Sequence, residues 1–264
     1  MKHNFVTQLL ICNFLILTNY AYGQRDSLWT ADQLSNITVY LIQKNLNSSP
    51  TGTGTIINHN KKFYLLTASH VAKEMNNNPK IVFRTTDDKP IIINLREITT
   101  KNQLNWLNHP EADISIIEII AVNKDIEKRL SDWSFSSKFI YNGTQVIARD
   151  NDLTFFGFPI LDLELKHFSP LSFTAFPASG LLTNKRYDID TKCSFFYLDQ
   201  PSMQGCSGSG VYCSVKKNFL YMGMGKTLMI GIVHGTAKDD TGRKLAAICP
   251  SFYIWDLLKQ VSSN

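Results

Sequence analysis

Gly205–Val211 reads Gly-Cys-Ser-Gly-Ser-Gly-Val, a glycine-rich turn that leads directly into an apolar strand. Ser207 has a glycine two positions before it and another one position after it, so the backbone can turn sharply and leave the hydroxyl bare. The N–H groups of such a turn can point at a bound anion. A serine hydroxyl attacks poorly unless a base takes its proton and a third group orients that base. The turn therefore predicts a histidine and an acid elsewhere in the chain.

Both residue types occur upstream, each beside an apolar segment. Residues 64–71, Tyr-Leu-Leu-Thr-Ala-Ser-His-Val, read as a buried strand that ends close to His70. Residues 112–117, Ala-Asp-Ile-Ser-Ile-Ile, place Asp113 at the start of another strand. The order along the chain is therefore histidine, aspartate, serine.

This order and these motifs resemble the trypsin-like serine proteases of the chymotrypsin fold. Their hallmarks are Thr-Ala-x-His, Asp-Ile with a following apolar residue, and Gly-x-Ser-Gly, which match the segments around His70, Asp113 and Ser207. Gly157-Phe158-Pro159 is similar to a strand of the bacterial members. The resemblance covers about residues 51–261 and implies an all-β fold of two six-stranded antiparallel β-barrels with a C-terminal helix.

The resemblance also implies a role for each residue. Ser207 would attack a peptide or ester carbonyl, His70 would accept and return the proton, and Asp113 would fix the histidine tautomer. The backbone N–H groups of Gly205 and Ser207 would form the oxyanion hole. Two other acids, Asp150 and Asp152, also lie between the histidine and the serine, but they precede a strand at a turn and fit no motif of the family.

Three regions are expected along the chain. Residues 1–23 have a basic start, an apolar body and an Ala-Tyr-Gly end, which together read as a secretory signal peptide. The mature protein would begin near Gln24 and be secreted or periplasmic, with no membrane span after cleavage; an uncleaved membrane anchor is the alternative. Residues 24–130 would form the N-terminal barrel, with its first strand at 34–42, and residues 131–264 the C-terminal barrel with a helix at 251–261. The charged segment 121–137 would connect the two barrels.

Composition limits the other function classes. The chain has 264 residues, 44% hydrophobic and 19% charged, which suits a globular protein with a substantial core. Its net charge of +5 is spread without long basic runs, so nucleic acid is not an expected partner. The expected partner is a polypeptide substrate, a monomer is favoured, and no cofactor or metal is expected. His109 is predicted to be a surface histidine in a loop rather than a base, and His167 a histidine of a polar loop without a catalytic role.

The four cysteines after the signal segment all lie in the second half of the chain: Cys193, Cys206, Cys213 and Cys249. They allow three full pairings, which the sequence does not separate. Cys206 stands where the animal digestive branch has an aspartate that builds the oxyanion hole after zymogen cleavage. A thiol offers no comparable charge, so we expect neutral contacts or a disulfide to hold the hole here.

Two positions bear on substrate preference. In trypsin-like members the residue six before the nucleophile lies at the floor of the specificity pocket, and here it is Pro201, which disfavours cleavage after lysine or arginine. His234 resembles the pocket histidine of glutamyl endopeptidases but stands one residue later than in their pattern. A slip of one residue in a strand exchanges faces unless a bulge restores it. The alternative reading places His234 beside Asp113, in support of the triad.

The sequence thus favours a secreted serine endopeptidase acting through His70, Asp113 and Ser207. The alternative is a catalytically latent or non-catalytic module that binds peptides in the cleft between the barrels.

Overall fold

The computed structural model describes residues 28–44, 49–85, 87–159, 168–213, 226–238 and 242–263. The predicted signal segment 1–23, Gln24 and His167 lie outside the described residues. None of the described helices is both long enough and apolar enough to cross a membrane.

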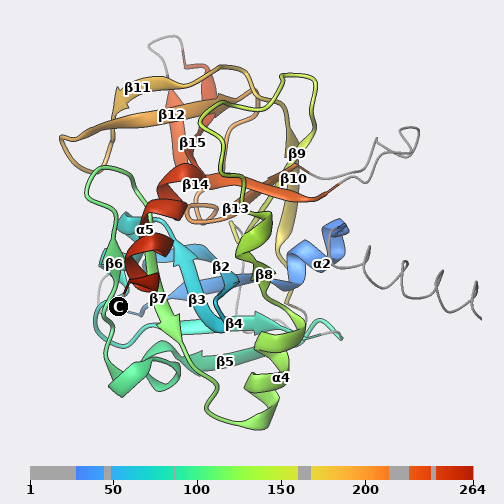
Figure 1. Ribbon diagram of the computed structural model, residues 1–264, viewed down its shortest axis with the longest axis vertical. Helices are drawn as coiled ribbons and strands as arrows, with labels where there is room; N and C mark the ends of the chain where they lie inside the picture. Colours follow the sequence, from blue (N-terminus) through green and yellow to red (C-terminus); the bar gives the residue numbers. More distant parts are fainter. Residues whose placement is uncertain are drawn as a thin grey trace, which may run out of the picture.

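Two mainly antiparallel sheets build the molecule, one from each half of the chain (Figure 1). Within the described residues the first sheet has eight strands in the order β5-β4-β1-β2-β3-β7-β6, with β8 paired to β2. Its strands are β1 Thr38–Ile42, β2 Thr51–His59, β3 Lys62–Thr67, β4 Lys80–Arg84, β5 Pro90–Asn94, β6 Leu107–Asn108, β7 Ser115–Ile119 and β8 Phe135–Ser136.

The second sheet has seven described strands in the order β10-β9-β13-β14-β15-β12-β11. They are β9 Leu153–Gly157, β10 Leu171–Ala175, β11 Leu182–Lys185, β12 Lys192–Leu198, β13 Gly210–Cys213, β14 Leu228–Lys238 and β15 Lys244–Pro250. The predicted all-β, two-barrel fold is thus confirmed, with more strands in each sheet than the six expected.

Four α-helices of the described chain lie outside the sheets: α2 Ala31–Asn36, α3 Ser69–Glu74, α4 Lys124–Asp132 and α5 Phe252–Ser262. The first strand begins at Thr38 and not at 34, because the residues before it form α2. Thr30 caps this helix by accepting a hydrogen bond from the Gln33 N–H. In the connecting segment, Asn123 caps α4 in the same way. β8 then pairs with β2 in parallel, so this connection is part of the first sheet.

α5 joins the two halves. In Figure 1 it follows β15 and runs down beside the first sheet. Its apolar face is buried through Ile254, Leu257 and Leu258, as the period of these residues predicts. Near its end the hydroxyl of Ser262 lies 2.8 Å from Nε2 of His59 in β2. The largest core cluster continues from the first sheet through α5 into β12 and β15, so the halves share a core.

Candidate active site

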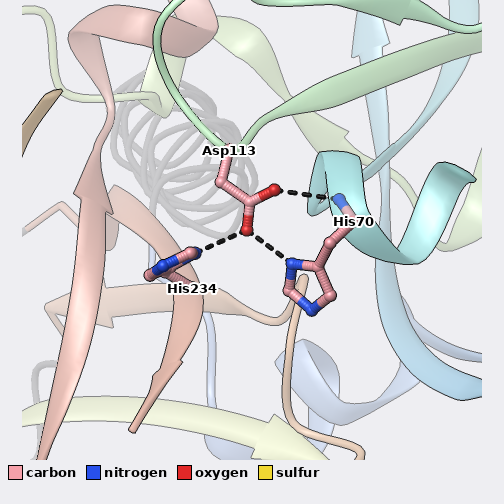
Figure 2. A group of neighbouring side chains, drawn as sticks. All are labelled: His70, Asp113 and His234. Atoms are coloured by element: carbon pink, nitrogen blue, oxygen red, sulfur yellow. Dashed lines mark hydrogen bonds and ion pairs between the residues drawn. The ribbon is translucent and has the colours of Figure 1, made fainter. Parts of the chain in front are cut away.

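Asp113 is the centre of a buried hydrogen-bond network (Figure 2). Its side chain is completely buried in the turn before β7. Oδ2 lies 2.6 Å from Nδ1 of His70 and 2.6 Å from Nδ1 of His234. Oδ1 accepts hydrogen bonds from the His70 backbone N–H at 2.9 Å and from Nη2 of Arg186 at 3.0 Å. All four contacts bring donors to one carboxylate.

These donors keep the carboxylate ionised. Burial alone would raise the pKa of Asp113, but the hydrogen bonds and positive charge of His234 and His70 outweigh burial and hold the pKa well below its usual 3.8. An ionised carboxylate only accepts hydrogen bonds, so Nδ1 of both rings carries the proton. In the neutral ring of His70, Nε2 is therefore the proton acceptor.

His70 lies in the first turn of α3, directly after β3. Ala68 is the N-cap of this helix and the last residue with extended backbone angles before the chain turns. A hydrogen bond of 2.8 Å between the hydroxyls of Ser115 and Ser69 ties this turn to the start of β7. The strand pair β3 and β7 thus brings His70 and Asp113 together, although they are far apart in sequence.

The turn before Ser207 is a type II turn. The Cys206 N–H donates to the Met203 carbonyl at 3.0 Å, and Gly205 has φ +90 at the third position of the turn. A Cβ at Gly205 would lie 2.8 Å from the Phe158 carbonyl oxygen, so only glycine fits. No described residue accepts a hydrogen bond from the N–H of Gly205 or of Ser207. Both N–H groups remain available for an oxyanion.

Thr53 of β2 fastens this loop to the first sheet. Its N–H donates to the Ser207 carbonyl at 2.9 Å, and its hydroxyl donates to the Gly205 carbonyl at 2.6 Å. Gly208 follows with φ +88, packed against the Thr53 carbonyl and the Thr67 hydroxyl. The loop that carries Ser207 is thereby held against β2 and the end of β3, next to the residues that lead into the helix of His70.

The four cysteines are free thiols. Cys206 is buried against Gly157, and burial raises the pKa of its thiol to about 11. Cys206 therefore contributes neutral packing to the loop that carries Ser207. Of the two expected contacts, neutral packing and a disulfide, the structure has the first.

His234 faces Asp113 from β14. The register of β14 against β15 shifts between Val233 and Gly235, so His234 sits at a bulge. Its side chain is buried and stacks on Phe195, with 4.9 Å between the ring centroids. This placement corrects the assignment of the His234 side chain to substrate binding and agrees with the alternative reading, a histidine that supports Asp113.

Pro201 is exposed at the start of the loop that leads to Gly205. The next residue, Ser202, joins this loop to β14, because its hydroxyl lies 2.8 Å from the Thr236 hydroxyl and its carbonyl accepts from that hydroxyl at 2.6 Å. The segment expected at the floor of a specificity pocket and the strand that carries His234 are thus bridged at this point.

Two residues of the site come from the loop between β11 and β12 and belong to no motif. Arg186 is buried and pairs with Asp188 at 2.6 Å as well as with Asp113. Tyr187 places its hydroxyl 3.3 Å from Nε2 of His70. The only signal in the sequence is an Arg-Tyr-Asp run in a polar loop, which is too common to indicate a site.

His70, Asp113 and His234 could be read as three metal ligands, since their ligand atoms lie within 4.8 Å of one another. The separation of 2.6 Å between the carboxylate oxygen and each ring nitrogen is that of a hydrogen bond, and each donating Nδ1 would have to lose its proton to bind a metal ion. The guanidinium of Arg186 beside the carboxylate adds positive charge that opposes a cation. The geometry supports a hydrogen-bonded network.

The prediction that His109 lies at the surface is wrong, because this histidine is buried next to α5. Its ring contacts Tyr253 with 4.8 Å between centroids, and its Nδ1 accepts the Ala112 N–H at 2.9 Å. It therefore shapes the turn that carries Asp113 and does not reach Ser207 through any described contact.

Comparison with known proteins places the fold. Neither a protein-family model nor a curated protein matches the chain. Solved structures do match: the MamO protease domain from Magnetospirillum magneticum has a TM-score of 0.57 and 14% identity, over 85% of this chain and 97% of that chain. The Rv3671c protease from M. tuberculosis in its active form has a TM-score of 0.54 and 13% identity, over 86% and 81%.

The HtrA-type protease AlgW with a tripeptide has a TM-score of 0.53 and 14% identity, over 88% of this chain and 64% of that chain. The chain therefore has the two-barrel, chymotrypsin-like fold of trypsin-like and HtrA-type bacterial serine proteases.

Proposed function

We propose that this chain is a serine endopeptidase that cleaves polypeptides through Ser207, His70 and Asp113. The observation that carries the proposal is the buried contact of 2.6 Å between Asp113 and Nδ1 of His70, which fixes the ring so that Nε2 acts as a base. The fold shared with serine proteases supports the same reaction at a coarser level.

In the proposed reaction the Ser207 oxygen bonds to the carbonyl carbon of the substrate while His70 takes the hydroxyl proton on Nε2. The negative oxygen that forms accepts hydrogen bonds from the N–H groups of Gly205 and Ser207. The C–N bond then breaks, and His70 gives its proton to the leaving amine. Water hydrolyses the acyl-enzyme by the same sequence of proton transfers.

A fluorophosphonate probe tests this proposal. The mature protein is expected to become labelled on Ser207, and both Ser207→Ala and His70→Ala are expected to lose the label, because one removes the nucleophile and the other removes its base. Tryptic mapping of the labelled protein identifies the residue. A matched control is Ser263→Ala, an exposed serine at the end of α5. Labelling that survives in Ser207→Ala would contradict the assignment.

The alternative, a latent or non-catalytic module that binds peptides, rests on one observation. No described hydrogen bond joins Ser207 to His70; the Ser207 hydroxyl donates to the His234 carbonyl at 3.1 Å. Peptide binding without labelling, in a protein that shows normal folding, would favour this alternative.

We also propose that the protein is exported and that residues 1–23 are removed. The basic start and apolar body of this segment support the proposal. Sequencing the N-terminus of the exported protein is expected to give Gln24 as the first residue. A first residue at Met1 would contradict cleavage and support a retained anchor.

A further inference from the structure

The hydroxyl of Tyr187 occupies the space between the proposed base and the proposed nucleophile. It lies 3.3 Å from Nε2 of His70 and donates to the His234 carbonyl at 2.8 Å. The Ser207 hydroxyl donates to the same carbonyl at 3.1 Å. Tyr187 thus contacts the proposed base and shares an acceptor with the proposed nucleophile.

The side chain of Tyr187 covers the strand edge next to this point. Its ring packs on His234 with 4.1 Å between the ring centroids, and a Cβ on Gly235 would lie 2.8 Å from both Cε1 and the hydroxyl oxygen of Tyr187. The pairing of β14 with β13 extends no further than Ile232, while the opposite edge of β14 pairs with β15. Among the described residues, residues 234–238 therefore have no strand partner on the edge that faces β13. An open edge of this kind accepts an extended peptide as an added strand. Tyr187 covers the first backbone units of that edge.

The loop between β11 and β12 is anchored at Arg186, so the side chain of Tyr187 can move while Arg186 stays in place. Arg186 is held by Asp113, by the Glu111 carbonyl at 3.1 Å and by both carboxylate oxygens of Asp188. Tyr187 exposes 60% of its surface, and its hydroxyl makes both the hydrogen bond to the His234 carbonyl and the 3.3 Å contact with Nε2 of His70. Rotation of its side chain toward solvent breaks these contacts and the ring contact with His234, and leaves the Arg186 anchor in place.

We propose that Tyr187 is an internal plug, which closes the active site in the resting protein and which a polypeptide displaces when it adds to the open edge of β14. Once the hydroxyl is displaced, the His234 carbonyl can accept a hydrogen bond from the backbone of the incoming polypeptide. Nε2 of His70 can then accept a hydrogen bond from Ser207. This inference rests on the proposed function for its meaning, but the plug itself is a physical contact that can be measured without catalysis.

Two rates test the plug in the wild-type protein, Tyr187→Ala and Tyr187→Phe. The first is labelling of Ser207 by the fluorophosphonate. The second is carbethoxylation of His70 by diethyl pyrocarbonate, read by peptide mass mapping, which needs only an accessible imidazole nitrogen. We expect Tyr187→Ala to raise both rates about tenfold, because the open form changes from a minor to the major population. Tyr187→Phe keeps the ring and loses the hydroxyl bonds, so its rates should lie in between.

Leu182→Ala is the control, since Leu182 is an exposed apolar residue on neighbouring β11 with 48% of its surface accessible. It should leave both rates unchanged. Unchanged or slower rates in Tyr187→Ala would overturn the plug, even if Ser207 is labelled and the protease proposal stands. Faster carbethoxylation of His70 with no labelling in any variant would keep the plug and reject the protease.

Discussion

Peptide hydrolysis by the Asp113→Asn variant is expected to be about 10⁴-fold slower than by the wild-type protein. Each carboxylate oxygen of Asp113 accepts two hydrogen bonds, Oδ1 from the His70 N–H and Arg186, and Oδ2 from the rings of His70 and His234. An amide has one N–H₂ end, and whichever way it turns, that end faces two donors. At the Oδ1 position it would face the Arg186 guanidinium, and at the Oδ2 position it would deprive His70 of the acceptor that keeps its proton on Nδ1.

Steady-state hydrolysis of a casein substrate by the two proteins measures this loss. Asp132→Asn is the matched control, because Asp132 is an exposed acid that pairs with Lys128 on the surface of α4. The control should retain wild-type activity. Hydrolysis by Asp113→Asn within about tenfold of the wild type would remove Asp113 from the mechanism.

The stability of the same variant is expected to depend less on pH than that of the wild-type protein. The pKa of Asp113 in the folded protein is below its usual 3.8, since hydrogen bonds from His234 and His70 outweigh the effect of burial. The stability that this carboxylate contributes is therefore complete above its unfolded pKa and is lost as the pH falls through its folded pKa. Urea unfolding at a series of acidic pH values should show a smaller dependence on pH in Asp113→Asn than in the wild type.

The Gly208→Ala variant is expected to lose at least about 3 kcal/mol of unfolding free energy. Gly208 has φ +88, which L side chains rarely adopt, and a Cβ there would collide with the Thr53 carbonyl and the Thr67 hydroxyl. Both contacts belong to the first sheet, whereas Gly208 belongs to the loop before β13. A methyl group would therefore push apart the two halves that hold the site.

Two control glycines separate strain from collision. Gly242 has the same φ of +88 with no atom within 4 Å of the position that a Cβ would take, so Gly242→Ala should cost about 1 kcal/mol from backbone strain alone. Gly180 has neither the positive φ nor a neighbour, and Gly180→Ala should change stability by less than about 0.5 kcal/mol. If urea unfolding gave Gly208→Ala the same stability as Gly242→Ala, the contact between the halves would be loose.

Local motifs were enough to nominate the residues of the site, and their resemblance to trypsin-like serine proteases predicted the fold class. The apolar strand before His70 and the short apolar strand after Asp113 have the lengths and composition of buried strands, and the glycines around Ser207 permit a backbone that other residues do not. Such signals lie within a few residues of the group that they present. These signals can therefore be recognised without knowing how the rest of the chain folds.

Contacts between distant segments could not be read in the same way. Arg186 meets Asp113 across 73 residues, and Tyr187 meets His70 across 117 residues. Neither residue has a local pattern that distinguishes it from an ordinary surface loop. His234 had two readings because a bulge in β14 can turn a side chain to either face, and only its partner Asp113 selected one.

The sequence by itself determined the turns and strands that present a histidine, an aspartate and a serine, because these depend on neighbouring residues, and the order of these motifs, through the resemblance to trypsin-like serine proteases, predicted the two-barrel fold. The packing of the two halves decided what surrounds Asp113 and that Tyr187 stands between Ser207 and His70. Those features depend on which loops meet in space. A carboxylate becomes buried and a strand edge is left unpaired only when the two halves pack together, so their energetic effects have no local signal in the sequence.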